Sequence, residues 1–176
     1  MKIENFEKLI DTRETNLTFD KDYLLVNKIQ LKKLKANNLT IEQKDKAFLI
    51  KYTTRTRVLA NTWISIINSL IKGLEEPYQI SLKKVYRKKF KFYHELDSTS
   101  KKIKITLFEK QRKPIIIDYS LEYFKPLDLK VSEEEIKYSC YSKEILGNSV
   151  SKLLGIRKGK LLRKDLRKFI TGYVRV

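Results

Sequence analysis

The residue types that most often carry catalysis are scarce in this chain. His94 is the sole histidine and has no Cys or His at metal-ligand spacing, so among its acidic neighbours we expect an exposed turn residue. Cys140 is the sole cysteine and falls in a strand-like stretch, which predicts a small buried side chain rather than a nucleophile. The run 133–135, three glutamates without a second acidic cluster, is typical of a solvated turn. With no Gly-rich phosphate loop and no Gly-x-Ser-x-Gly motif, the sequence predicts no catalytic residue, no metal site, no cofactor and no enzyme.

Basic residues, by contrast, are clustered. From Lys152 to Arg175 the chain carries a dense series of Lys and Arg against one acid, Asp165, and a second basic stretch runs from Lys83 to Lys91. Such side chains neutralise phosphates and release counterions on binding. The RNA-binding residues that we predict are Lys83, Lys84, Arg87, Lys88, Lys89, Lys143, Lys152, Arg157, Lys158, Lys160, Arg163, Lys164, Arg167, Lys168 and Arg175.

Each basic stretch also has an interpretation without a ligand. The C-terminal one could be a solvated basic helix whose Leu161, Leu162, Leu166 and Phe169 pack on the protein; RNA contact is favoured by the overall charge. In the other stretch, Phe90 and Phe92 could stack on unpaired bases, but aromatics alternating with lysines are more typical of the inner face of a strand. We therefore expect these two rings in the core and the lysines on phosphates.

Composition points to a strongly anionic partner. The 176 residues have a formal net charge of +18, which favours nucleic acid first and an anionic membrane second. No apolar run is long enough to cross a bilayer, and the acidic N-terminus is unlike a signal or transit peptide. Lys, Ile, Asn, Tyr and Phe are abundant and Ala, Gly and Pro are few, which is typical of AT-rich codons. An AT-rich bacterium, a virus or a gene inside an organelle would each give such a composition, and an N-terminus unlike a transit peptide adds weight to the organelle-encoded gene.

The second half of the chain should position the basic residues through strands and one helix. Tyr78 to Leu82 alternates like a strand, a hairpin with its turn at 97–100 should follow, and strands should lie near 115–117 and 127–131. The stretch 136–141 predicts a last strand. Ser142 can cap the helix after it, and Gly155 has the residue type that ends helices.

The first half reads as short strands followed by one strong helix. Strands are predicted at 23–26, 29–31, 39–41 and 48–50, and residues 1–15 form a candidate extension. An apolar stripe through Trp63 predicts a helix from about Thr56 to Lys72, closed by Gly73 and Pro77, with Trp63 in the core.

Both halves therefore run through several strands to a strand that feeds a helix. Ile-Lys-Tyr occurs before each helix, at 50–52 and at 136–138. This predicts an α+β protein of two tandem small domains, each a mainly antiparallel sheet packed against one helix. We expect an N-terminal domain at 1–77, a C-terminal domain at 78–155 and a basic C-terminal tail at 156–176.

The same residues resemble the ribosomal protein L-six family of the large subunit, in its bacterial and organellar form. Lys143 matches a turn lysine of the family, Leu146-Gly147-Asn148 stands where the family has Val-Gly-Gln, and Arg157 aligns with a later arginine. Pro114-Ile115 is similar to the family's His-Pro-Val. The stretch 67–74 is similar to the end of its first-domain helix. The likeness covers roughly Phe48 to Arg157; Ser142 and Glu144 stand where the family has Asp and Gln.

The resemblance implies a structural constituent of the large ribosomal subunit. Its second domain and tail would bind large-subunit rRNA near the translation-factor region, beside neighbouring ribosomal proteins and without membrane or small-molecule substrate. A divergent mitochondrial copy fits the composition. Two other classes stay open: a plasmid or phage DNA-binding regulator, and a nuclease using Asp118, Glu122 and Asp128 with a divalent metal.

Overall fold

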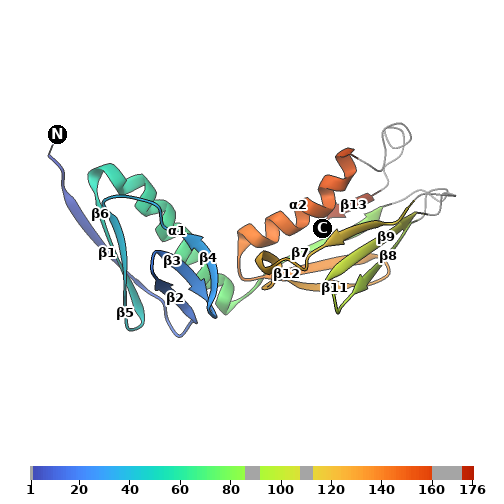
Figure 1. Ribbon diagram of the computed structural model, residues 1–176, viewed down its shortest axis with the longest axis horizontal. Coiled ribbons are helices and arrows are strands. Elements are labelled where there is room, and N and C mark those ends of the chain that lie inside the picture. Colours follow the sequence, from blue (N-terminus) through green and yellow to red (C-terminus); the bar gives the residue numbers. More distant parts are fainter. Residues whose placement is uncertain (1, 86–91, 108–112, 160–171) are drawn as a thin grey trace. The chain divides into compact units, whose positions relative to one another are not determined.

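The protein has an α+β fold, as the sequence predicts. The computed structural model describes residues 2–85, 92–107, 113–159 and 172–176, and within these ranges the chain forms two α-helices and 13 strands in four small antiparallel sheets (Figure 1). The chain divides into two compact units, residues 1–76 (unit 1) and 77–176 (unit 2), which are described one at a time. Within the described ranges, no helix combines the length and apolar character needed to span a membrane.

Unit 1 contains two three-stranded sheets. The first has the order β1 (Asn5–Asp11), β6 (Ala47–Thr53), β5 (Leu39–Lys44), and the second has the order β2 (Leu17–Asp20), β3 (Tyr23–Val26), β4 (Ile29–Lys33). The four strands predicted between residues 23 and 50 are confirmed. Residues 1–15 are not an extension, because β1 pairs with β6 along its whole length and turns Ile10 into the core.

Tight turns set the register of the second sheet. Lys21 and Asp22 join β2 to β3, Asn27 and Lys28 join β3 to β4, and all four have positive φ, between 46° and 69°. Two successive left-handed residues make the hairpin turn whose twist matches that of the flanking strands. Asp and Asn tolerate this conformation better than most residues, so Asp22 and Asn27 favour turns at these two positions.

Helix α1 (Arg57–Glu75) packs its apolar stripe on the core of unit 1. Trp63 is 3% exposed and Ile67 is fully buried, so the predicted core role of this stripe is confirmed. The Trp63 ring meets Phe19 edge to face, with centroids 6.4 Å apart. The helix runs three residues past its predicted end at Lys72. It stops at the residue pair before Pro77, where the proline disfavours helical geometry.

Unit 2 contains a four-stranded and a three-stranded sheet. The former has the order β11 (Asp128–Val131), β12 (Glu135–Cys140), β7 (Tyr78–Val85), β13 (Gly172–Arg175), and the latter has the order β10 (Ile115–Asp118), β9 (Lys102–Leu107), β8 (Phe92–Asp97). The predicted hairpin is confirmed as β8 and β9, paired from Phe92–Leu107 to Asp97–Lys102. Cys140 is 2% exposed, as expected for a small core side chain, and burial raises the pKa of its thiol.

Helix α2 (Lys143–Gly159) packs against β12 and β7 (Figure 1). The amide of Ile145 donates to Oγ of Ser142 at 3.4 Å, which confirms the predicted cap. The predicted end at Gly155 is wrong, since the helix continues to Gly159. A glycine inside a helix costs only about 1 kcal/mol relative to alanine, which neighbouring turns can offset.

The predicted separate tail at 156–176 is also wrong for its described residues. Residues 156–159 belong to α2, and Gly172–Arg175 forms β13, which pairs with β7. Residues alternate along this strand: Tyr173 is 7% exposed and faces the core, and Val174 is exposed on the opposite face. Arg175 shares the side of Tyr173 but is exposed as the last residue of the strand. Residues Gly172–Arg175 are therefore an edge strand of the four-stranded sheet.

Candidate nucleic-acid interface

Five of the predicted RNA-binding side chains lie in the described part of the structure, all in unit 2. They are Lys83, Lys84, Lys143, Lys152 and Arg175. Arg157 and Lys158 have only their backbone described, in α2. The remaining predicted residues, Arg87, Lys88, Lys89, Lys160, Arg163, Lys164, Arg167 and Lys168, lie outside the described residues.

Lys83 and Arg175 are the two that point into solvent from neighbouring strands. In the β7–β13 register Lys83 stands opposite Val174, and Arg175 stands opposite Leu82. Both side chains are exposed and neither makes a hydrogen bond or ion pair with another described residue. Register partners share a face, so Lys83 lies with Val174 on the outer face of the sheet, and Arg175 lies on the side of buried Leu82. The two cations can therefore reach phosphates only from opposite faces of the sheet.

Lys84 is half-buried beside an aromatic ring. Its Nζ lies 5.5 Å from the ring centroid of Phe92 and 3.5 Å from the Phe92 carbonyl oxygen. Phe92 is itself 4% exposed, so its predicted place in the core is confirmed; Phe90 lies outside the described residues. The Lys84 ammonium is thus shared between the protein and any anion that approaches β7.

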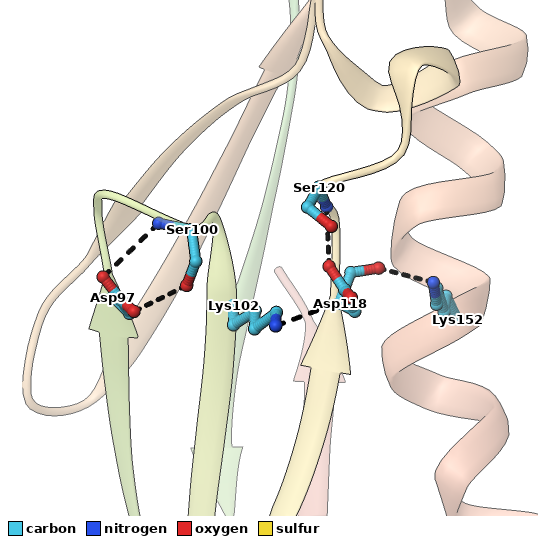
Figure 2. Close-up of polar contacts among 6 residues, drawn as sticks. All are labelled: Asp97, Ser100, Lys102, Asp118, Ser120 and Lys152. Atoms are coloured by element: carbon cyan, nitrogen blue, oxygen red, sulfur yellow. Dashed lines mark hydrogen bonds and ion pairs between the residues drawn. The ribbon is translucent and has the colours of Figure 1, made fainter.

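Lys143 and Lys152 are also engaged within unit 2. Lys143 Nζ lies 4.7 Å from the ring centroid of Tyr78. Lys152 Nζ donates to the main-chain oxygen of Asp118 at 2.5 Å (Figure 2) and lies 5.1 Å from the ring centroid of Phe124. A lysine held by a carbonyl and an aromatic face ties α2 to the end of β10.

Replacing Lys152 by Ala should therefore lower the stability of unit 2 more than its affinity for RNA. Loss of one charge-assisted hydrogen bond and one exposed cation–π contact is worth about 1 kcal/mol. Urea unfolding followed by far-UV circular dichroism measures the change. The control is Lys104→Ala, because the Lys104 side chain is exposed on β9 and its loss should leave the midpoint unchanged. Equal effects of the two substitutions would contradict the role of Lys152 in holding α2 to β10.

The carboxylates of Asp97 and Asp118 stabilise turns at the ends of their strands. Asp97 accepts from the amide and hydroxyl of Ser100, Asp118 accepts from the amide of Ser120 at 2.8 Å, and Lys102 Nζ lies 3.9 Å from Asp118 Oδ2 (Figure 2). Hydrogen bonds to their charged forms lower the pKa of both carboxyls. Within the described ranges, no group of three or more His, Cys, Asp or Glu side chains could hold a metal ion.

His94 corrects the sequence prediction of an exposed turn residue. It is 8% exposed, its Nδ1 lies 2.8 Å from the Tyr173 hydroxyl, and its Nε2 lies 2.5 Å from the Ser132 carbonyl oxygen. Nε2–H must donate to the carbonyl, so neutral Nδ1 accepts from the Tyr173 hydroxyl. The signal was its place two residues after Phe92, since alternate residues of a strand share a face.

Acid should therefore destabilise unit 2 through His94. Burial is the main cause that lowers its pKa, helped by the charge of Lys84 and opposed by the Ser132 carbonyl and Glu134. A lowered pKa in the folded state means that the stabilisation is complete above the ordinary value of 6.5 and is lost as pH falls below it. Urea midpoints from far-UV circular dichroism between pH 7.5 and 5 should fall. The fall should be smaller in His94→Gln; an equal fall would assign the effect to other groups.

In comparisons with known proteins, no protein-family model and no curated protein matches the chain.

Positive charge is concentrated in unit 2. Residues 77–176 contain 25 Lys and Arg against 11 Asp and Glu, an excess of 14, whereas residues 1–76 contain 14 against 10, an excess of 4. The two excesses add up to the +18 of the whole chain. An anionic partner will therefore be attracted mainly to unit 2.

The described residues that flank three further segments lie together in unit 2. Val85 is the register partner of Gly172, and Phe92 is the partner of Leu107. The Phe92 ring also meets Tyr173, next to Gly172, with centroids 5.4 Å apart. The segments that begin or end at these residues are 86–91, 108–112 and 160–171, which include most of the predicted RNA-binding residues.

Sequence reasoning missed two exposed lysines on the four-stranded sheet. Lys130 of β11 and Lys137 of β12 are register partners on the side away from buried Ile136 and Tyr138. Lys137 Nζ lies 3.7 Å from Glu135 Oε2, which partly offsets the repulsion between the two lysines. Period-two alternation with the buried residues was the signal that could have found them.

Proposed function

We propose that this protein is a structural constituent of the large ribosomal subunit, of the L-six type, and that unit 2 binds large-subunit rRNA. The observation that carries the proposal is the excess of 14 positive charges in residues 77–176. The order of motifs from Phe48 to Arg157 supports the choice of this RNA-binding class. In this proposal the two units are tandem copies of one α+β module, each with two small sheets and one long helix in its described part.

Binding would be electrostatic and would need no catalytic group. Lys83 on the outer face of the sheet and Arg175 at the end of β13, with the basic residues of neighbouring segments, would neutralise phosphates. Arg175 can present two parallel N–H donors to one phosphate, which a lysine cannot. On the same resemblance, the particle would be a mitochondrial ribosome, with this protein near the translation-factor region.

The test is association of the tagged full chain with ribosomal particles. The expected result is co-sedimentation with the large subunit on a sucrose gradient, and retention of purified large-subunit rRNA at least tenfold tighter than a DNA duplex of equal length. Free protein at the top of the gradient with tighter binding to one duplex would contradict the proposal and favour a DNA-binding regulator. Magnesium-dependent cleavage that stops with a chelator would favour a nuclease.

A further inference from the structure

Strand β1 is an open edge of seven residues in unit 1. It pairs with β6 on one side, and it lies at the end of the order β1-β6-β5, so its other side has no neighbouring strand among the described residues. The ladder fixes which groups are open. Thr12 N–H donates to Lys46 O, and Glu4 O accepts from Thr54 N–H, so even-numbered residues turn toward β6. The N–H and C=O of Asn5, Glu7, Leu9 and Asp11 therefore point outward.

The side chains of the same residues suit a protein segment. Alternation places Glu7, Leu9 and Asp11 on the sheet face opposite to buried Ile10. Leu9 is 62% exposed, and Ile3, just before the strand, is 55% exposed. Exposed apolar side chains beside open backbone groups are the features by which an added strand is held.

The acidic side chains on and beside β1 indicate the charge of the partner that this edge would bind. Glu4, Glu7 and Asp11 make no ion pair with a described residue, although the whole chain carries +18. Three other acids of unit 1 do pair. These pairs are Glu14–Lys46, Glu42–Lys51 and Glu75–Arg13. Lys51, the register partner of Glu7, attracts that carboxylate, and Arg13 attracts Asp11, without forming an ion pair. Lys8 of β1 lies on the opposite sheet face. Glu7 and Asp11 therefore remain the charged side chains of β1 on the face of Leu9, where they attract cations.

A second copy of this chain fits the edge poorly. Pairing two β1 strands would bring together the faces that carry Glu7 and Asp11, and two chains of net charge +18. Like charges opposite one another in a ladder are destabilising. An extended basic segment of a different protein can hydrogen-bond to the open backbone groups, cover the exposed apolar side chains and pair with the acids at the same time.

We infer that β1 is a docking edge to which an extended basic segment of another protein adds as a fourth strand. The segment hydrogen-bonds to Asn5, Glu7, Leu9 and Asp11, places its lysines or arginines near Glu7 and Asp11, and covers Leu9. This docking does not depend on RNA binding by unit 2.

The test uses the ¹⁵N-labelled full chain and the peptide acetyl-Lys-Val-Lys-Val-Lys-Val-Lys-amide. In the free chain, the amides of Phe6, Lys8 and Ile10 should be protected from hydrogen exchange by β6, and the four outward amides should exchange quickly. The peptide should protect the outward amides, and its counterpart with Glu in place of Lys should not. No protection, protection elsewhere in the chain, or protection of these amides by self-association or by added RNA would overturn the inference.

Two variants distinguish the contribution of backbone hydrogen bonds to peptide binding from the contribution of charge. Leu9→Pro removes an outward N–H and leaves the bonds to β6 intact, so fluorescence of Trp63 should show a folded unit 1 while peptide protection is lost. Glu7→Gln with Asp11→Asn should weaken the peptide about tenfold, because an exposed ion pair contributes a factor of about 3. The matched control, Asp20→Asn with Asp22→Asn, removes the same charge from the end of β2 and the turn after it, and should leave peptide binding unchanged. An equal loss would mean that overall charge alone explains the effect.

Discussion

Raising the NaCl concentration from 50 to 200 mM should weaken binding of the full chain to large-subunit rRNA about a thousandfold or more. A protein that makes roughly 6 to 10 phosphate contacts releases a similar number of counterions, and its affinity falls steeply with salt. Unit 2 has an excess of 14 positive charges available for such contacts. Filter binding at four salt concentrations gives the slope. A nearly flat dependence would contradict phosphate neutralisation as the mechanism.

The slope can be assigned to unit 2 by matched substitutions. Changing Arg157, Lys158 and Lys160 together to Ala should reduce the slope by about 2 on single-stranded RNA, since each phosphate contact contributes about 0.7. The same variant should incorporate poorly into large subunits. The control changes three exposed lysines of unit 1, namely Lys2, Lys35 and Lys72. If the control lowers the slope as much, the binding is unspecific attraction to the whole chain.

Local periodicity explains how much of the fold the sequence predicts. The strand Tyr23–Val26 has the predicted bounds, because apolar residues between turn-forming residues leave few alternatives. Helix α1 follows from a stripe in which Trp63, Ile67 and Leu70 recur at helical spacing. Ser142 caps α2 as predicted, since the cap depends on neighbours three residues away.

The elements that the sequence misassigns are edge strands formed by pairing over long distances. Strand β1 is mostly exposed and partly acidic, so it looks like a polar extension until β6 provides its hydrogen bonds. Strand β13 lies in a basic stretch, and only the position of Tyr173 in the core explains it. The strand propensity of a local stretch gives no information on these contacts, because the partners are tens of residues apart in the chain.

The same limit applies to the candidate site. The sequence identifies cations, but not which of them the protein uses itself. Lys152 is held by the carbonyl of Asp118, 34 residues away, and Lys143 lies over the ring of Tyr78. Lys83 and Arg175 have no such contact among the described residues, and only the register of β7 and β13 shows that they lie on opposite faces of the sheet.

Replacing Tyr173 by Ala should cost about 3–5 kcal/mol of the stability of unit 2. The ring is 7% exposed, packs on Phe92 edge to face, and stacks on His94 with centroids 5.8 Å apart and planes within 5°. Truncation leaves a cavity and removes the hydroxyl that donates to Nδ1 of His94. Because β13 lies at an edge of the sheet and pairs with β7 alone among the described strands, the loss should release this strand first.

Two comparisons make the result specific to the buried ring. Tyr173→Phe keeps the packing and should cost only about 1–2 kcal/mol, the value of one buried hydrogen bond and an unpaired histidine nitrogen. Val174→Ala, exposed on the same strand, should change the free energy of unfolding by less than about 0.5 kcal/mol. Unfolding must be followed by hydrogen exchange or far-UV circular dichroism, since the sole tryptophan, Trp63, reports on unit 1. Equal costs for Tyr173→Ala and Val174→Ala would mean that β13 is not anchored through its tyrosine.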